Sequence, residues 1–197
     1  MQIEVQTMSQ ILWTMQNLSF DETLCRKFIE EVKIQELDSL LLKAHFLENM
    51  VFEQGKITHY SQEKHLPAMK QKLLEELLWH IGNFACSDPT AYMEYEIDKQ
   101  IHLLCLTYKK SLSPVVWAKV TWIMKSLSRF AQNLREESTH DNTLMKEEHD
   151  YSTTDIFSNF CAQFSEIILE AIGKLPVIAA DFVELLDNTY FCASDEI

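Results

Sequence analysis

Residues 67–89, PAMKQKLLEELLWHIGNFACSDP, contain the pattern that decides the fold. Pro67 stands where a helix tolerates proline in its first turn, and Asp88-Pro89 is a second start signal at the other end. Between them, apolar residues recur three and four positions apart and form one wide stripe: Leu73, Leu74, Leu77, Leu78, Ile81 and Phe84. The stretch therefore predicts a helix that packs against a core.

The same spacing recurs along the chain, and turn-forming residues are scarce. The 197 residues include three glycines and four prolines, whereas ordinary proteins contain about 7% Gly and 5% Pro. Strands need Gly- and Pro-rich turns about every 8–12 residues. We therefore predict an all-α fold, an irregular globular bundle of seven or eight helices with no sheet.

The predicted organisation is a single helical domain over residues 1–197. The polar residues 55–66 predict a loop, and the pattern wavers near Lys33–Ser39, where we expect a break. Residues 136–151 are acidic and almost without apolar periodicity. They predict a long loop that separates a six-helix part (1–135) from a C-terminal helical hairpin (152–191), because loops of this length are usually functional or mobile.

Negative charge is concentrated at one end of the chain. The net charge is −13, and residues 137–197 contribute −11 of it, with thirteen acidic and two basic residues. This charge disfavours nucleic acid, whose binding depends on Lys and Arg contacts with phosphates. It would attract a basic protein segment and speed the encounter. The alternative is that the charge serves solubility alone.

The cysteines and the N-terminus indicate where the protein works. Five cysteines are present, no two within a CxxC or zinc-ligand spacing. Such thiols suit a reducing compartment. The first residues, Met-Gln-Ile-Glu-Val, lack the pattern of a signal peptide, and no stretch is apolar enough to span a membrane. We expect a cytoplasmic protein without membrane insertion, and a non-classical export route remains open.

Catalytic and metal-binding motifs are weak. Glu76 and His80 are four residues apart and share a helix face, and His59 and His65 flank Glu63 in the expected loop. The Glu-x-x-His spacing of di-iron bundles occurs once, at Glu137 and His140, whereas such a site needs two. No nucleophile motif or phosphate-binding glycine loop is present. We predict no metal, no cofactor and no catalytic residues, and we expect His59, His65, His80 and His140 to be dispensable for folding.

Two segments have more apolar residues than one buried helix face requires, and this excess indicates function more strongly than the catalytic or metal-binding motifs do. Trp117 and Trp122 are five residues apart and diverge by about 140° around a helix. Phe182 belongs to a C-terminal segment that is apolar on two sides. Each of these aromatics is either a core residue or an anchor for a partner. As candidate partner-binding residues we take Trp117, Trp122 and Phe182, together with the acidic Glu147, Glu148 and Asp150.

These features favour a non-catalytic protein-interaction module: an adaptor, a chaperone or an assembly subunit. The expected partner is another protein with a basic or amphipathic helical segment, bound through an acidic surface and an apolar groove. In size, charge and lack of motifs the chain resembles the small acidic chaperones of bacterial secretion systems, although no residue motif carries that resemblance. Two alternatives are a helical metal- or cofactor-dependent enzyme that uses Glu and His residues, and a ligand-sensing regulatory bundle.

Overall fold

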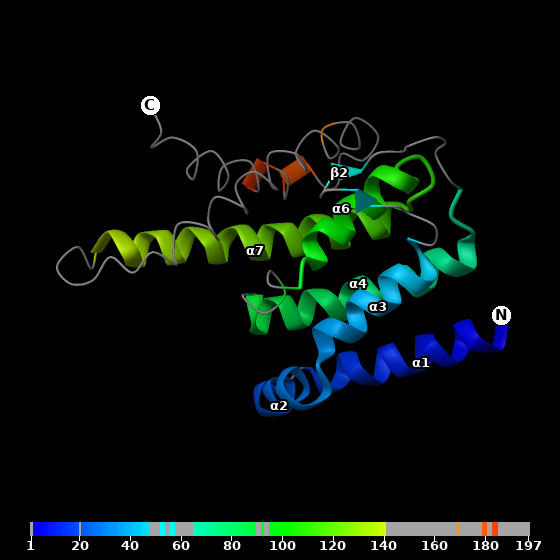
Figure 1. Ribbon diagram of the computed structural model, residues 1–197, viewed down its shortest axis with the longest axis horizontal. Coiled ribbons are helices and arrows are strands. Elements are labelled where there is room, and N and C mark those ends of the chain that lie inside the picture. Colours follow the sequence, from blue (N-terminus) through cyan, green and yellow to red (C-terminus); the bar gives the residue numbers. More distant parts are fainter. Residues whose placement is uncertain are drawn as a thin grey trace. The chain divides into compact units, whose positions relative to one another are not determined.

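The structure is a computed structural model, shown in Figure 1. It describes residues 2–19, 21–47, 52–53, 56–57, 65–89, 92, 95–140, 169, 179–180 and 183–184. Phe182 and the acidic residues Glu147, Glu148 and Asp150 lie outside the described residues.

The described elements are mostly helical. The helices are α1 (Gln2–Leu18), α2 (Glu22–Val32), α3 (Ile34–His45), α4 (Ala68–Ser87), α6 (Ile97–Tyr108) and α7 (Pro114–His140). The all-α class is thus confirmed, with six helices in the described part of the chain rather than the expected seven or eight. The described residues that depart from the all-α class are two strands of two residues each, β1 (Phe52–Glu53) and β2 (Lys56–Ile57), which pair in antiparallel orientation. Within the described residues, this hairpin contradicts the predicted absence of a sheet, and its second strand lies in the expected loop of residues 55–66.

The chain separates into two compact units, Met1–Val120 and Thr121–Ile197. The boundary between the units falls inside α7. The single domain with a divide at residues 136–151 stays a prediction. Helix α7 continues through residues 136–140, the first five residues of the expected acidic loop, and residues 141–151 lie outside the described residues. Residues 136–140 contain no glycine or proline that would end the helix.

Helix boundaries follow local chemistry. The Asp21 side chain accepts a hydrogen bond from the Leu24 backbone N–H at 3.0 Å and caps the start of α2. Lys33 has a φ angle of 50° and separates α2 from α3, within the expected region of the break. At the start of α7, the Ser113 hydroxyl accepts from the Val116 N–H at 3.2 Å, immediately before Pro114, as the Ser-Pro signal predicts.

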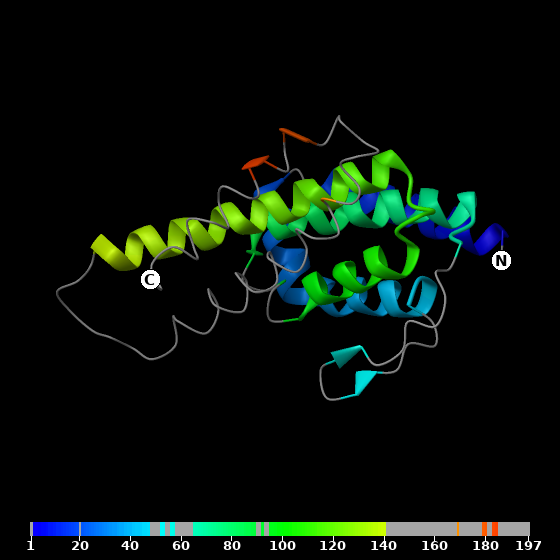
Figure 2. The same cartoon turned by 90° about the horizontal axis from the view of Figure 1, so that it is seen from above.

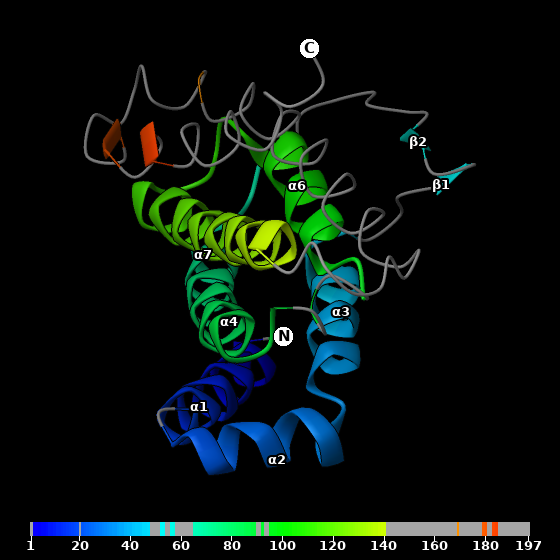
Figure 3. The same ribbon diagram turned by 90° about the vertical axis from the view of Figure 1, so that its left-hand side faces the viewer.

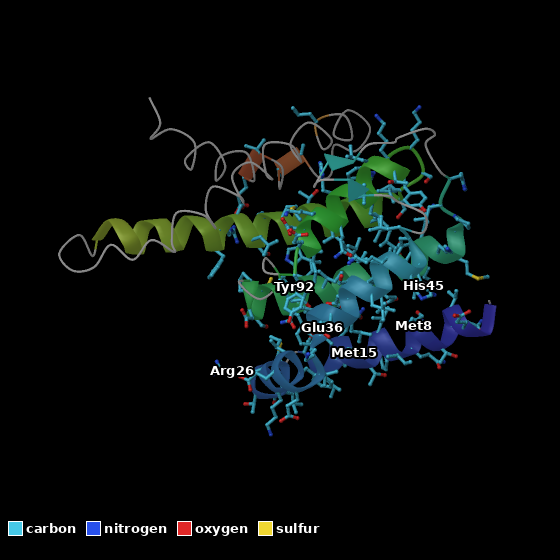
Figure 4. The ribbon with its side chains drawn as sticks, viewed as in Figure 1. Met8, Met15, Arg26, Glu36, His45 and Tyr92 are labelled. Atoms are coloured by element: carbon cyan, nitrogen blue, oxygen red, sulfur yellow. The ribbon has the colours of Figure 1, made fainter. Side chains whose placement is uncertain are left out.

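In the first unit, α4 is the central helix. Helix α1 lies along α4, α3 lies beside α6, and α2 contacts α3 and α4 (Figures 2 and 3). The apolar stripe expected on α4 is fully buried. On α1, the buried Met15 and the half-buried Met8 lie on the side toward the rest of the unit (Figure 4). The opposite side of α1 is exposed.

None of the helices in the described ranges combines the length and the apolar character that crossing a membrane requires.

Candidate functional site

An exposed tryptophan lies where α4 meets the start of α7. Trp79 of α4 has an exposed fraction of 44%, and Val115 of α7 has 50%. The Lys119 ammonium nitrogen lies 3.9 Å from the centroid of a Trp79 ring, the arrangement of a cation–π interaction. We call Glu75, Trp79, Val115 and Lys119 the Trp79 surface.

The start of α7 is fixed to α4 by one hydroxyl group. Besides capping α7, the Ser113 Oγ donates a hydrogen bond to Glu75 Oε1 at 2.9 Å. Lys119 follows six residues later on α7, and Glu75 and Trp79 are one turn apart on α4. The two helices are therefore held together at the point where Lys119 covers the indole.

Lys119 is in a partly desolvated position. Burial lowers the pKa of its ammonium group below the usual 10.5, and the nearby carboxylates of Glu76 and Glu75 oppose that shift. A cation held against the indole limits the rotation of the Trp79 side chain. A partly exposed tryptophan with a fixed orientation can bind an apolar partner surface with little further loss of entropy.

A second cluster is fully buried between α3, α4 and Tyr92. His80 Nε2 lies 2.9 Å from Asp38 Oδ1, and neither side chain is exposed. The Tyr92 hydroxyl donates to the other carboxylate oxygen, Asp38 Oδ2, at 2.6 Å; Tyr92 is labelled in Figure 4. The His80 ring also makes an edge contact with Phe84 at 4.7 Å between centroids.

This buried cluster carries acid–base residue types but is closed to a substrate in this structure. His80 Nε2 and Asp38 Oδ1 are at ion-pair distance without the alignment of a hydrogen bond, and His80 Nδ1 makes no hydrogen bond. Burial, followed by the influence of Asp38, raises the pKa of Tyr92 well above 10 and keeps its proton in place. We therefore infer a structural role for the cluster. This role argues against the prediction that His80 is dispensable for folding, and unfolding measurements on His80→Ala decide between the two.

Glu76 and His80, the pair that the alternative enzyme hypothesis would use, do not form a common site in this structure. Glu76 accepts hydrogen bonds from Gln16 Nε2 of α1, through its backbone oxygen at 2.7 Å and its carboxylate at 3.0 Å. His80 instead contacts Asp38 of α3. Although the residues are four apart, their polar groups bind different helices. Among the residues that the structure describes, no group of three or more His, Cys, Asp or Glu side chains is arranged to hold a metal ion.

The tryptophans predicted as anchors have different environments. Trp117 has an exposed fraction of 3% and lies in the first unit, which favours the core alternative for this residue over a role as partner anchor. Trp122 belongs to the second unit and is half-buried. The sequence analysis missed Trp79, although it is the aromatic residue of α4 that lies off the apolar stripe.

Two basic residues of α7 neutralise an acidic residue of the C-terminal third. Lys125 Nζ lies 3.3 Å from Glu184 Oε2, and the Arg129 guanidinium contacts the other oxygen of the same carboxylate. Lys125 and Arg129 therefore use their shared helix face for a contact within the second unit.

Comparisons with models of protein families, with curated proteins and with solved structures found no match to this chain.

Proposed function

We propose that this protein is a non-catalytic protein-interaction module and that the Trp79 surface binds its partner. The observation that carries the proposal is the tryptophan that is 44% exposed and held by a lysine at 3.9 Å. Tryptophan is the residue type most enriched among those that dominate binding energies at interfaces.

The chemistry of the surface selects a particular kind of partner. Trp79 and Val115 offer apolar area, and Glu75 and Lys119 place one charge of each sign beside it. An amphipathic helix suits such a surface, because its apolar side can cover the indole while its polar residues meet the charges.

The acidic C-terminal third contributes to the rate of encounter in this proposal. Its net charge of −11 would attract a partner with basic residues. Electrostatic attraction speeds association, whereas apolar anchors determine how long the complex lasts. The two parts of the chain would thus act on different rate constants.

Site-specific photo-crosslinking tests this proposal. A photoreactive residue replaces Val115 on the Trp79 surface, and a control protein carries it at Leu40 of α3, which has an exposed fraction of 62%. In native extract we expect one discrete protein adduct from position 115 that is absent from position 40. The adduct should disappear when Trp79→Ala is added. Equal adducts from both positions, or an adduct that survives Trp79→Ala, would refute this location of the binding surface.

A further inference from the structure

The outward side of α1 is almost without charge. Glu4 is the single charged residue among the seventeen of α1, whereas α2 has five among eleven. Trp13 has an exposed fraction of 62%, and Ile11 has 48%. Seven of the eight exposed residues described in α1 are uncharged: Gln6, Thr7, Gln10, Ile11, Trp13, Thr14 and Asn17. The centre of an interface differs from ordinary surface in having few charged residues and more aromatic ones. The outward side of α1 has this composition.

We infer that these seven residues, the α1 face, form a self-association surface on which two copies of this chain meet about a two-fold axis. Each copy carries a net charge of −13, so two copies repel one another through most of their surface. Among the described helices, α1 has the lowest share of charged residues, so a symmetric contact through the α1 face places few like charges against their own copies.

The side chains of the α1 face suit a symmetric contact. Around a two-fold axis each residue meets its own counterpart or a close neighbour of it, so a charged residue would meet its own sign. Amides and hydroxyls both donate and accept hydrogen bonds, and therefore pair with copies of themselves. Gln6, Gln10 and Thr7 are of this kind, and Trp13 and Ile11 supply the apolar area. A basic partner would instead select a surface with acidic residues.

Side chains of the α1 face already donate hydrogen bonds within the helix. The Thr14 hydroxyl donates to the Gln10 carbonyl at 2.9 Å, and the Asn17 amide nitrogen donates to the Trp13 carbonyl at 2.8 Å. Because these two donors already have acceptors, burying them against a second copy does not leave them without a hydrogen bond. The inward side is committed to the unit through buried Leu12 and the Gln16 bonds to Glu76, so the α1 face stays outward.

Sedimentation equilibrium of the full chain over a concentration series tests the inference. We expect a monomer–dimer equilibrium for the wild type. Trp13→Glu should raise the dimer dissociation constant about 30-fold or more, because the loss of an anchoring aromatic is of that size and each substitution changes both sides of the contact. The matched control is Leu40→Glu, since Leu40 of α3 is also 62% exposed; it should leave the dissociation constant unchanged.

A second variant and the salt dependence give independent readouts. Gln10→Glu changes an exposed helical position without loss of helix propensity, and it should also weaken the dimer. Added salt should strengthen the dimer, because it screens the repulsion between two acidic chains. A chain that stays monomeric throughout, a dimer that tolerates both α1 variants, or one that salt weakens would overturn the inference. Because Trp79 is unchanged in these variants, they test the inference separately from the proposed function.

Discussion

His80 and Asp38 form a fully buried pair that links α4 to α3. The imidazole Nε2 and the carboxylate Oδ1 are 2.9 Å apart, and the side chains belong to residues 42 positions apart in the sequence. Tyr92 donates to the second carboxylate oxygen. Each of the three groups would be an isolated polar group in an apolar interior if its neighbours were removed.

Replacing one member of this pair should strongly destabilise the first unit. We expect Asp38→Ala and His80→Ala each to lower the free energy of unfolding by about 3–5 kcal/mol. Asp38→Ala leaves the His80 ring and the Tyr92 hydroxyl buried without the carboxylate, and His80→Ala leaves the buried Asp38 Oδ1 without its partner. Tyr92→Phe should lower it by about 1–3 kcal/mol. Urea unfolding followed by circular dichroism measures these changes, with the exposed His65→Ala as the control. A His80→Ala protein as stable as His65→Ala would contradict a structural role for the pair.

Asp98 should make stability depend on pH. Its side chain has an exposed fraction of 6%, and burial raises the pKa of the carboxyl from 3.8 to about 6 despite the opposing Lys99 backbone N–H. Because the folded state holds this proton more tightly, the stabilisation is fully present below pH 3.8 and is lost as the pH rises through about 6.

The variant Asp98→Asn removes this titration. Its stability relative to the wild type should therefore rise by about 2.5 kcal/mol between pH 4 and pH 7, since one pKa unit corresponds to about 1.4 kcal/mol. Unfolding free energies at both pH values provide the comparison, which also cancels the titration of the other carboxyl groups. A constant difference between the two proteins would show that Asp98 titrates normally.

Trp79 and Trp117 of the first unit should respond differently to truncation. Trp117→Ala should lower the free energy of unfolding by about 3–5 kcal/mol, because it leaves a cavity in the core. Trp79→Ala should change it by about 1 kcal/mol or less, which is the scale of an exposed cation–π contact. Thermal unfolding of both variants measures the contrast. Similar losses in the two proteins would place Trp79 in the core as well.

Charge reversal in the acidic segment should slow partner binding. Replacing Glu147, Glu148 and Asp150 together by lysine should reduce the association rate constant by about tenfold at low salt and leave the dissociation rate constant nearly unchanged, because exposed charges act mainly on encounter. Stopped-flow mixing with the partner at several salt concentrations provides the test. A rate constant that is insensitive to both the substitutions and the salt would leave solubility as the role of this charge.

Local signals in the sequence were sufficient to predict the helical class and several boundaries. The Ser113-Pro114 signal and the apolar stripe after Pro67 depend on neighbouring residues, and the structure has helices at both places. The division inside α7 was not predictable in this way. Periodicity continues across Val120 without a change in composition, and the compact units depend on contacts between distant segments.

The candidate sites were less predictable, because burial depends on the partners of a helix face. Trp117 and Trp79 both stand among apolar residues, yet the first is buried and the second is exposed. Asp38 gives no sign in the sequence that it contacts His80. A useful signal was the position of an aromatic relative to the apolar stripe, and both Trp79 and Trp13 lie off the stripes of their helices.

The most direct test of the protein-interaction account is the affinity of the crosslinked partner, once purified, for three forms of the chain. Isothermal titration would compare the wild type with Trp79→Ala and with Leu40→Ala, whose side chain is exposed on another helix. The account predicts that Trp79→Ala raises the dissociation constant about 30-fold or more, because it removes an anchor of about 2 kcal/mol. It also predicts that Leu40→Ala binds the partner with the affinity of the wild type. Equal affinities for all three folded proteins would contradict it.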